Sequence, residues 1–95
     1  MGMLAAAVVI PNWNGAKLLA EFLPSVLGQI RAAARVVVVD NGSTDDSVEV
    51  TRRFGAEVIR LEHNLGFAAA VNRGVQATAE PWIAIVNNDV RLAAD

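Results

Sequence analysis

Two carboxylates in this sequence follow apolar runs, where a buried strand would bring them to the edge of a sheet. Asp40 comes directly after four valines, and Asp89 comes after the run WIAIV and two asparagines. A carboxylate at the position of Asp40 can accept hydrogen bonds from a nucleobase N–H or from sugar hydroxyls. Asp89, beside amide oxygens, can hold Mg²⁺ or Mn²⁺, which prefer oxygen ligands. Both positions also fit an ordinary polar turn, because Asp, Asn and Gly are common turn formers.

Polar side chains or glycine follow every apolar run of the chain. In order, the candidate residues behind the four runs are Pro11, Trp13 and Asn14, then Asp40 and Asn41, then Asn64 and Gly66, then Asn87, Asn88 and Asp89. Parallel strands end at one edge of their sheet, and ligands of such folds bind there. These residues are therefore predicted to lie together. Trp13 is expected either to pack on a base or sugar or to lie at the edge of the core. The neighbouring polar residues Ser43, Thr44 and Asp45 are better explained as helix caps.

The apolar runs predict four strands, over residues 5–10, 35–39, 57–61 and 82–86. They are rich in β-branched residues and do not alternate strictly with polar ones, which indicates strands covered on both faces. The segments between them have a helical period, so the predicted order is β-α-β-α-β-α-β. This order favours an α/β fold, an open and mainly parallel sheet with helices on both faces.

Three helices are predicted between the strands. Apolar residues line one face from Leu19 to Ile30, although Pro24 predicts a kink or the start of a new turn of helix. The second helix is expected to begin within residues 43–46 and to end before Gly55. The third is expected to cover residues 67–78. Its apolar residues, spaced four apart, are Phe67, Val71 and Val75, and its alanines at 68–70 are small enough to permit tight packing.

Composition limits the classes of protein that fit. The chain has 95 residues, 54% of them hydrophobic, and a net charge of −2, so residues 1–95 are expected to form a single globular unit without a basic patch for nucleic acid. It has no cysteine, which fits a reducing compartment such as the cytoplasm. No apolar run approaches the roughly 18–20 residues that cross a bilayer, so membrane association would need a segment of a longer protein. The glycine-rich loops of dinucleotide-binding and P-loop proteins are missing, which counts against both classes.

Four segments of the sequence point to a known family. VVIPNWNG, VVVVDNGSTDDS, HNLGFAAAVNRGV and IAIVNND occur in an order and spacing that resemble family 2 glycosyltransferases with the GT-A fold, in particular the rhamnosyltransferase-like branch. The similarity covers nearly the whole chain and corresponds to the Rossmann-like N-terminal half of that fold. It implies a nucleotide-diphospho-sugar donor, a divalent cation (Mg²⁺ or Mn²⁺), and inverting transfer of the sugar to a hydroxyl of a glycan, a lipid-linked compound or another acceptor.

The resemblance also assigns roles to residues of this sequence. In chain order these are Pro11, Trp13 and Asn14 beside the base, Asp40 and Asn41 at the base and ribose, Asn64, Gly66 and Asn72 in the donor site, and Asn87, Asn88 and Asp89 at the Asp-x-Asp position. Asp89, with Asn87, is implied to hold the metal and the diphosphate. Asn87 replaces the first carboxylate of that motif, so weaker metal binding is expected.

Family members continue with an acceptor-binding half that supplies the catalytic base, and no residue of this sequence matches that base. The chain is therefore expected to be a truncated donor-binding unit, inactive by itself and able to self-associate through an exposed surface. The alternative is a non-catalytic α/β nucleotide-binding module or a receiver-like signalling module. A receiver would have an acidic pair after its first strand and a lysine after its last, and neither is present.

Overall fold

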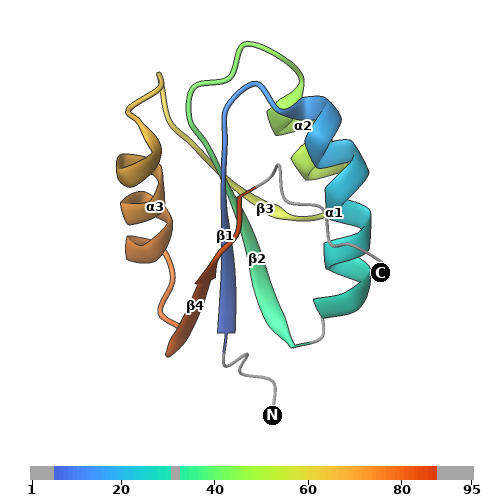
Figure 1. Ribbon diagram of the computed structural model, residues 1–95, viewed down its shortest axis with the longest axis vertical. Coiled ribbons are helices and arrows are strands. Elements are labelled where there is room, and N and C mark those ends of the chain that lie inside the picture. Colours follow the sequence, from blue (N-terminus) through green and yellow to red (C-terminus); the bar gives the residue numbers. More distant parts are fainter. Residues whose placement is uncertain (1–5, 31–32, 88–95) are drawn as a thin grey trace.

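A computed structural model describes residues 6–30 and 33–87 of the chain, in which strands and helices alternate (Figure 1). In order these elements are β1 (Ala6–Asn12), α1 (Ala16–Ile30), β2 (Ala34–Asp40), α2 (Ser47–Arg53), β3 (Glu57–Arg60), α3 (Phe67–Gln76) and β4 (Trp82–Ile85). The predicted order is confirmed, with bounds that differ by a few residues. No helix in the described ranges is both long enough and apolar enough to cross a membrane.

The strands form one parallel sheet in the order β3-β2-β1-β4. β1 pairs with β2 along its whole length, up to the pair of Asn12 with Asp40. The chain moves outward from β1 to β3 and then returns to place β4 on the other side of β1. The strand order therefore reverses between β1 and β4, and in open α/β sheets a ligand crevice forms beyond the carboxyl ends at such a reversal.

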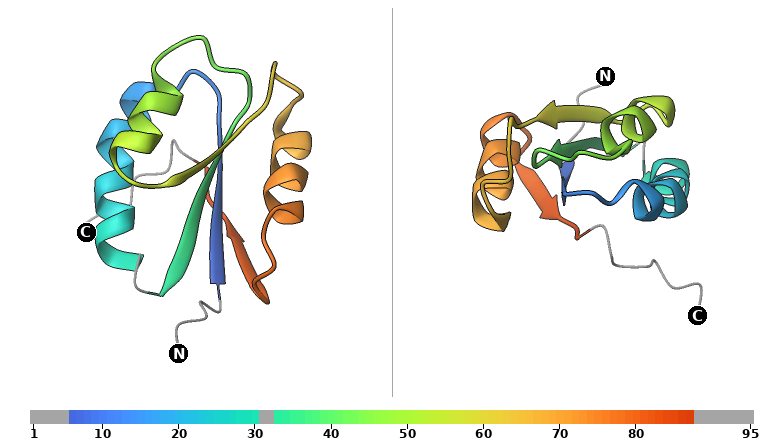
Figure 2. Two further views of the ribbon diagram at one scale, coloured as in Figure 1. Left: turned by 180° about the vertical axis from the view of Figure 1, so that it is seen from behind. Right: turned by 90° about the horizontal axis from the view of Figure 1, so that it is seen from above.

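Helices cover both faces of the sheet, as predicted (Figure 2). Alternate residues of a strand point to opposite faces, so Ile10 of β1 packs with α1 and α2 while Val9 packs with α3. The two central strands, β1 and β2, are almost entirely buried. For β3 and β4 the prediction of burial on both faces is wrong, since both are partly exposed edge strands of the described sheet. Helix α3 lies mainly over the central strands β1 and β2, and α2 contacts β3 more than β2.

Helix α1 continues through Pro24, so no new helix begins there. The predicted buried face is confirmed, and its residues are Leu19, Phe22, Leu23, Val26 and Leu27. Pro24 lies on the exposed side of the helix. The packing of the opposite face against the sheet stabilises α1 despite the backbone donor that proline lacks.

Helix α3 packs on the sheet through small residues, as its run of alanines allows, and not through the predicted stripe of large ones. Phe67 is 58% exposed and Val75 is 39% exposed. The buried residues of α3 are Ala70 and Gly74, one helical turn apart. Small side chains on this face let the helix come close to β1 and β2, and the larger residues are turned away from the sheet.

Gly74→Ala is expected to lower the free energy of unfolding by about 1–3 kcal/mol, the usual cost of overfilling a packed core. A Cβ at Gly74 would collide with the side chain of Val9 and lie 3.0 Å from Cγ2 of Val39. Gly28→Ala in α1 is the matched control, because a Cβ at Gly28 would meet no atom within 4 Å. The control is expected to gain about 0.5–1 kcal/mol from helix propensity. Urea unfolding measures both, and equal stability of the two variants would contradict the close packing of α3.

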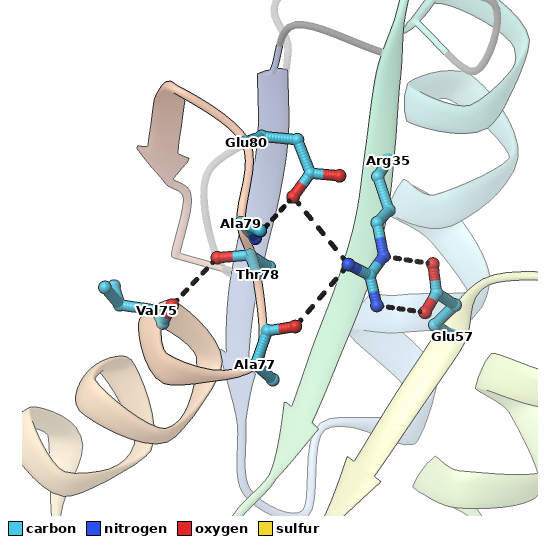
Figure 3. A network of polar contacts seen from close by, with 7 residues as sticks. All are labelled: Arg35, Glu57, Val75, Ala77, Thr78, Ala79 and Glu80. Carbon is cyan, nitrogen blue, oxygen red and sulfur yellow. Dashed lines mark hydrogen bonds and ion pairs between the residues drawn. The ribbon is translucent and has the colours of Figure 1, made fainter. Parts of the chain in front are cut away.

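At the end of the sheet where the strands begin, Arg35 ties β2 to β3 and to the segment before β4 (Figure 3). Its guanidinium donates two hydrogen bonds to the carboxylate of Glu57, of 2.7 and 2.8 Å, and its Nη1 lies 3.7 Å from Oε1 of Glu80. The hydrogen bonds with Arg35 lower the pKa of Glu57, although burial acts in the other direction. Because the pair is partly exposed, it contributes less than about 1 kcal/mol. It lies at the opposite end of the sheet from the predicted ligand edge.

Candidate functional site

A hollow of about 210 Å³ lies at the carboxyl ends of the strands, where their order reverses. It is lined by Pro11, Asn12, Trp13, Asn41, Asn64, Phe67 and Asn87. All of these except Asn12 and Phe67 are candidates predicted from the sequence. The expectation that polar residues behind different strands lie together is therefore met for this group.

The loop after β1 presents Trp13 to solvent and ties its neighbour Asn14 to the loop after β2. Asn14 has a positive φ of 49°, which asparagine tolerates better than most residues. Its backbone N–H donates to Oγ of Ser43 (2.8 Å), and its side-chain Oδ1 accepts from the N–H of Thr44 (2.8 Å). Trp13 is 55% exposed and belongs to neither core cluster of the described residues, which counts against the interpretation that it lies at the core edge. It is a free aromatic surface at the rim of the hollow.

Asp40 is buried, with 1% of its surface exposed, and its carboxylate is hydrogen-bonded within the chain. Its Oδ1 accepts from Nδ2 of Asn12 (3.1 Å) and from the hydroxyl of Ser43 (2.7 Å), and its Oδ2 accepts from the N–H of Ser43 (3.0 Å). Of the two roles that the sequence left open, the structure shows the one that holds a turn. Contact of Asp40 with a base or ribose stays a prediction.

Of the predicted helix caps, Asp45 acts on two helices at once. Its carboxylate accepts from the N–H of Ser47 at the start of α2 (2.9 Å) and from the N–H of Ala16 at the start of α1 (3.1 Å). Burial acts to raise the pKa of Asp45, but these bonds and one from the Ser47 hydroxyl hold that pKa below its ordinary value. For Ser43 and Thr44 the prediction of a cap is wrong, because both bond instead to the loop after β1.

Asn41 holds the loop that leads into α3. Its side chain is 5% exposed, its Nδ2 donates to the carbonyl of Gly66 (3.0 Å), and its Oδ1 accepts from the N–H of Leu65 (2.9 Å). Asn64 completes the turn by accepting from the N–H of Gly66 (2.8 Å). Gly66 has a φ of 95°, a conformation that side chains disfavour, which explains the glycine at this position.

A second glycine lets the loops after β2 and β3 touch. Gly42 has a φ of 78°, and a Cβ there would collide with the backbone of His63. The three loops after β1, β2 and β3 are thus joined side by side. Hydrogen bonds join the first two, and the hydrogen bonds of Asn41 together with close backbone contact at Gly42 join the last two. This gives the hollow a wall fixed by the fold.

Three predicted residues are not found at the hollow, one because it lies elsewhere and two because the structure does not describe them. Asn72 is exposed on α3, half a turn of helix away from the buried Ala70 and Gly74, and it does not line the hollow. Asn88 and Asp89 lie outside the described residues. Their predicted contacts with the diphosphate and metal therefore remain predictions.

The described lining of the hollow consists of amides, aromatic rings and a proline, with no charged side chain. Within residues 6–30 and 33–87 there is also no group of three or more His, Cys, Asp or Glu side chains that could hold a metal. Asn87 is the predicted metal ligand that the hollow does contain, and its amide oxygen is of the kind that Mg²⁺ and Mn²⁺ accept. Such a surface suits a neutral, flat, hydrogen-bonding group such as a nucleobase.

Sequence reasoning missed Asn12 and Phe67. Asn12 was counted with the loop, but it is the last residue of β1, 3% exposed, and its amide bonds to Asp40 across the strand pair. The register of β1 and β2, which the sequence alone did not provide, would have indicated this pair. Phe67 was assigned to the apolar face of a helix, and its position directly after Gly66 was the signal that it leaves that face.

Comparison with known proteins gives consistent relatives. A family model described as "Glycosyl transferase family 2" matches residues 7–95 of the chain. An uncharacterized glycosyltransferase of Mycobacterium tuberculosis is 42% identical over 90 residues, which cover 95% of this chain and 39% of that protein. The succinoglycan biosynthesis protein ExoU of Rhizobium meliloti is 37% identical over 87 residues, which cover 86% of this chain and 25% of ExoU. The chain thus spans well under half the length of these relatives.

Solved structures share the fold. The mannosyltransferase PcManGT from Pyrobaculum calidifontis, in complex with GDP-Man and Mn²⁺, matches with a TM-score of 0.83 and 26% identity over 90% of this chain and 27% of that one. TarS 1-349 of S. aureus, in complex with UDP-GlcNAc, matches with a TM-score of 0.82 and 26% identity over 90% of this chain and 27% of that one. These matches confirm the predicted fold class, an α/β unit of the GT-A type.

Proposed function

The chain belongs to glycosyl transferase family 2, and from this premise we propose that it forms the donor-binding part of an inverting glycosyltransferase. That enzyme would move a sugar from a nucleotide-diphospho-sugar to an acceptor hydroxyl. The observation that carries the proposal is the hollow at the reversal of strand order, whose described wall consists of amides, aromatic rings and a proline without a charged side chain. The structural neighbours PcManGT and TarS 1-349 were solved with GDP-Man and UDP-GlcNAc, which supports a donor of the same class.

In this proposal the hollow receives the nucleoside of the donor. The indole of Trp13 offers a flat face on which a base can stack, an interaction that all bases share. The amides of Asn64 and Asn87 offer donors and acceptors at the same rim. Pro11 lines the hollow, and Asn14, Asp40 and Gly66 hold the loops that surround it, so most of the predicted donor residues have a structural reason to matter.

The diphosphate of the donor would need a divalent cation. The described lining has no lysine or arginine to meet its negative charge, and the whole chain has a net charge of −2. We propose that Asn87 and Asp89 hold Mg²⁺ or Mn²⁺, which would neutralise the departing nucleoside diphosphate. PcManGT was solved with Mn²⁺, which supports this assignment.

No described residue is assigned to the binding of the acceptor, whether this is a glycan, a lipid-linked compound or another hydroxyl compound. Inverting transfer needs a base that removes the proton of the acceptor hydroxyl as this oxygen attacks the anomeric carbon. The described lining of the hollow contains no carboxylate or histidine that could do so. We therefore propose that the 95-residue chain binds the donor but does not transfer its sugar. The rhamnosyltransferase-like branch and a cytoplasmic location remain part of the proposal.

Calorimetric titration of the chain with UDP, GDP and their sugar conjugates, with and without Mn²⁺, tests this function. Weak, saturable binding that Mn²⁺ strengthens is the expected result, together with no sugar transfer. If the folded chain binds none of these compounds, or if the chain alone transfers the sugar efficiently, the proposal is contradicted.

We also propose that copies of the chain self-associate through the exposed edge strand β4, where Trp82 is 72% exposed. Sedimentation measured beside the titration tests this.

The alternative of a receiver-like module finds no support in the structure. A receiver holds its metal with a cluster of carboxylates at the carboxyl edge of its sheet. The described residues contain no such cluster, and Asp40, the carboxylate at that edge, is engaged in hydrogen bonds that hold the loops.

A further inference from the structure

Phe67 is an aromatic side chain that belongs to neither hydrophobic core of the described residues. It is 58% exposed, although burial of phenylalanine normally stabilises a small domain. Helix α3 packs on the sheet through Ala70 and Gly74 instead. Phe67 lines the same hollow as Trp13, which is 55% exposed. Two large rings are therefore exposed to water at the rim of one hollow, one on the loop after β1 and the other at the first residue of α3.

The position of Phe67 is fixed by the residues before it. Phe67 is the first residue of α3, and Gly66, with its φ of 95°, turns the chain into that helix. Asn41 holds this turn by hydrogen bonds to the N–H of Leu65 and to the carbonyl of Gly66, on the two residues that precede Phe67. Both atoms of the Asn41 amide head are thus engaged with the backbone, and its side chain is nearly buried.

We propose that Phe67 is a second stacking surface for the nucleobase of the donor, beside Trp13, and that Asn41 is a positioning residue that sets Phe67 in place. This inference rests on the proposed function. It changes the role predicted for Asn41, from a direct contact with base and ribose to a hold on the loop. A base has two π-faces, and a slot with an aromatic ring for each can bind it with little dependence on hydrogen bonds.

The first test replaces Phe67 and measures the affinity for UDP and GDP in the presence of Mn²⁺. Phe67→Ala is expected to weaken binding by about 10- to 100-fold, as loss of one stacking ring does in other sites. Phe67→Tyr keeps the ring and is expected to bind within about threefold of the original chain. Val75→Ala, an exposed apolar residue of the same helix that does not line the hollow, is the matched control and should leave the affinity unchanged.

The second test asks whether Asn41 acts through Phe67. Asn41→Ala alone is expected to weaken nucleotide binding by about tenfold, but in a chain that already carries Phe67→Ala it should add less than about twofold. Asn41→Asp, which keeps the acceptor for the N–H of Leu65, serves in its place if urea unfolding shows that the alanine variant is not folded. If the fold-losses in affinity of the two single variants multiply in the double variant, Asn41 does not act through Phe67, and the positioning role is overturned.

The probes separate this inference from the function on which it rests. If the original chain binds neither nucleotide, the proposed function fails and the inference with it. If the original chain binds them and Phe67→Ala binds equally well, the inference alone is overturned. Inorganic pyrophosphate with Mn²⁺, which has no base, should bind the original chain and Phe67→Ala alike, and a loss of pyrophosphate binding in Phe67→Ala would also contradict a stacking role.

Discussion

Asp40→Ala is expected to lower the free energy of unfolding by about 2–4 kcal/mol and to abolish nucleotide binding. The carboxylate is 1% exposed and accepts three hydrogen bonds, from Nδ2 of Asn12 and from the N–H and hydroxyl of Ser43. Alanine would leave these groups without their acceptor in a site that water reaches poorly. Because Ser43 also bonds to Asn14, the substitution would weaken one of the contacts that hold the loop with Trp13.

Two further variants isolate the cause of this loss. Asp40→Asn has nearly the same shape, but its NH₂ group must face at least one of the donors that the carboxylate serves, so an intermediate loss of stability is expected. Asp46→Ala is the matched control, because Asp46 is an exposed carboxylate at the start of α2 with no capping hydrogen bond from its side chain. Asp46→Ala should change the free energy of unfolding by no more than about 0.5 kcal/mol. Urea unfolding with a parallel UDP titration measures both quantities. Full stability of Asp40→Ala would contradict the network described around the carboxylate.

Mn²⁺ is expected to strengthen the binding of UDP or GDP by about tenfold or more, which corresponds to about 1.4 kcal/mol or more. The described wall of the hollow has no charged side chain, so the wall itself offers no cation to the diphosphate. An added cation would offset that charge in a chain with a net charge of −2. The gain in affinity that Mn²⁺ gives to UDP should exceed the gain that it gives to uridine, which has no phosphate.

Asp89→Ala tests which residue holds this cation. The substitution is expected to remove the effect of Mn²⁺ on UDP affinity and to leave the affinity without Mn²⁺ nearly unchanged. Asp46→Ala again serves as the control, since it removes the same charge from another part of the chain. Persistence of the full Mn²⁺ effect in Asp89→Ala would show that the predicted metal assignment is wrong.

The fold was largely predictable because its signals are local. Runs of β-branched residues need burial, and their alternation with helical periods leaves few arrangements other than a parallel sheet. The contacts of helix α3 were harder to predict from the sequence. Its large residues suggested one face, and its run of alanines indicated only that tight packing was possible. The helix packs through Ala70 and Gly74, and the partner surface on Val9 shows why small residues are needed there.

The site was predictable in place but not in its internal connections. The strand ends indicated which loops meet, so most of the residues around the hollow were found. The role of Asn41 and the bond of Asp40 to Asn12 depend on hydrogen bonds between residues 24 to 28 positions apart in the chain. The periodicity of apolar residues in the sequence does not reveal such contacts. The motif therefore identified residues that matter, while the structure shows that these two hold loops together.

The central claim, that the hollow at the strand ends binds a nucleotide, is tested most directly by the fluorescence of Trp13. Trp82→Phe removes the other tryptophan of the chain, which lies at the opposite end of the sheet, and leaves Trp13 as the reporter. Titration of this variant with UDP and with GDP in the presence of Mn²⁺ should give a saturable change in emission. An unchanged Trp13 signal up to millimolar nucleotide, in a chain that circular dichroism shows to be folded, would contradict the account.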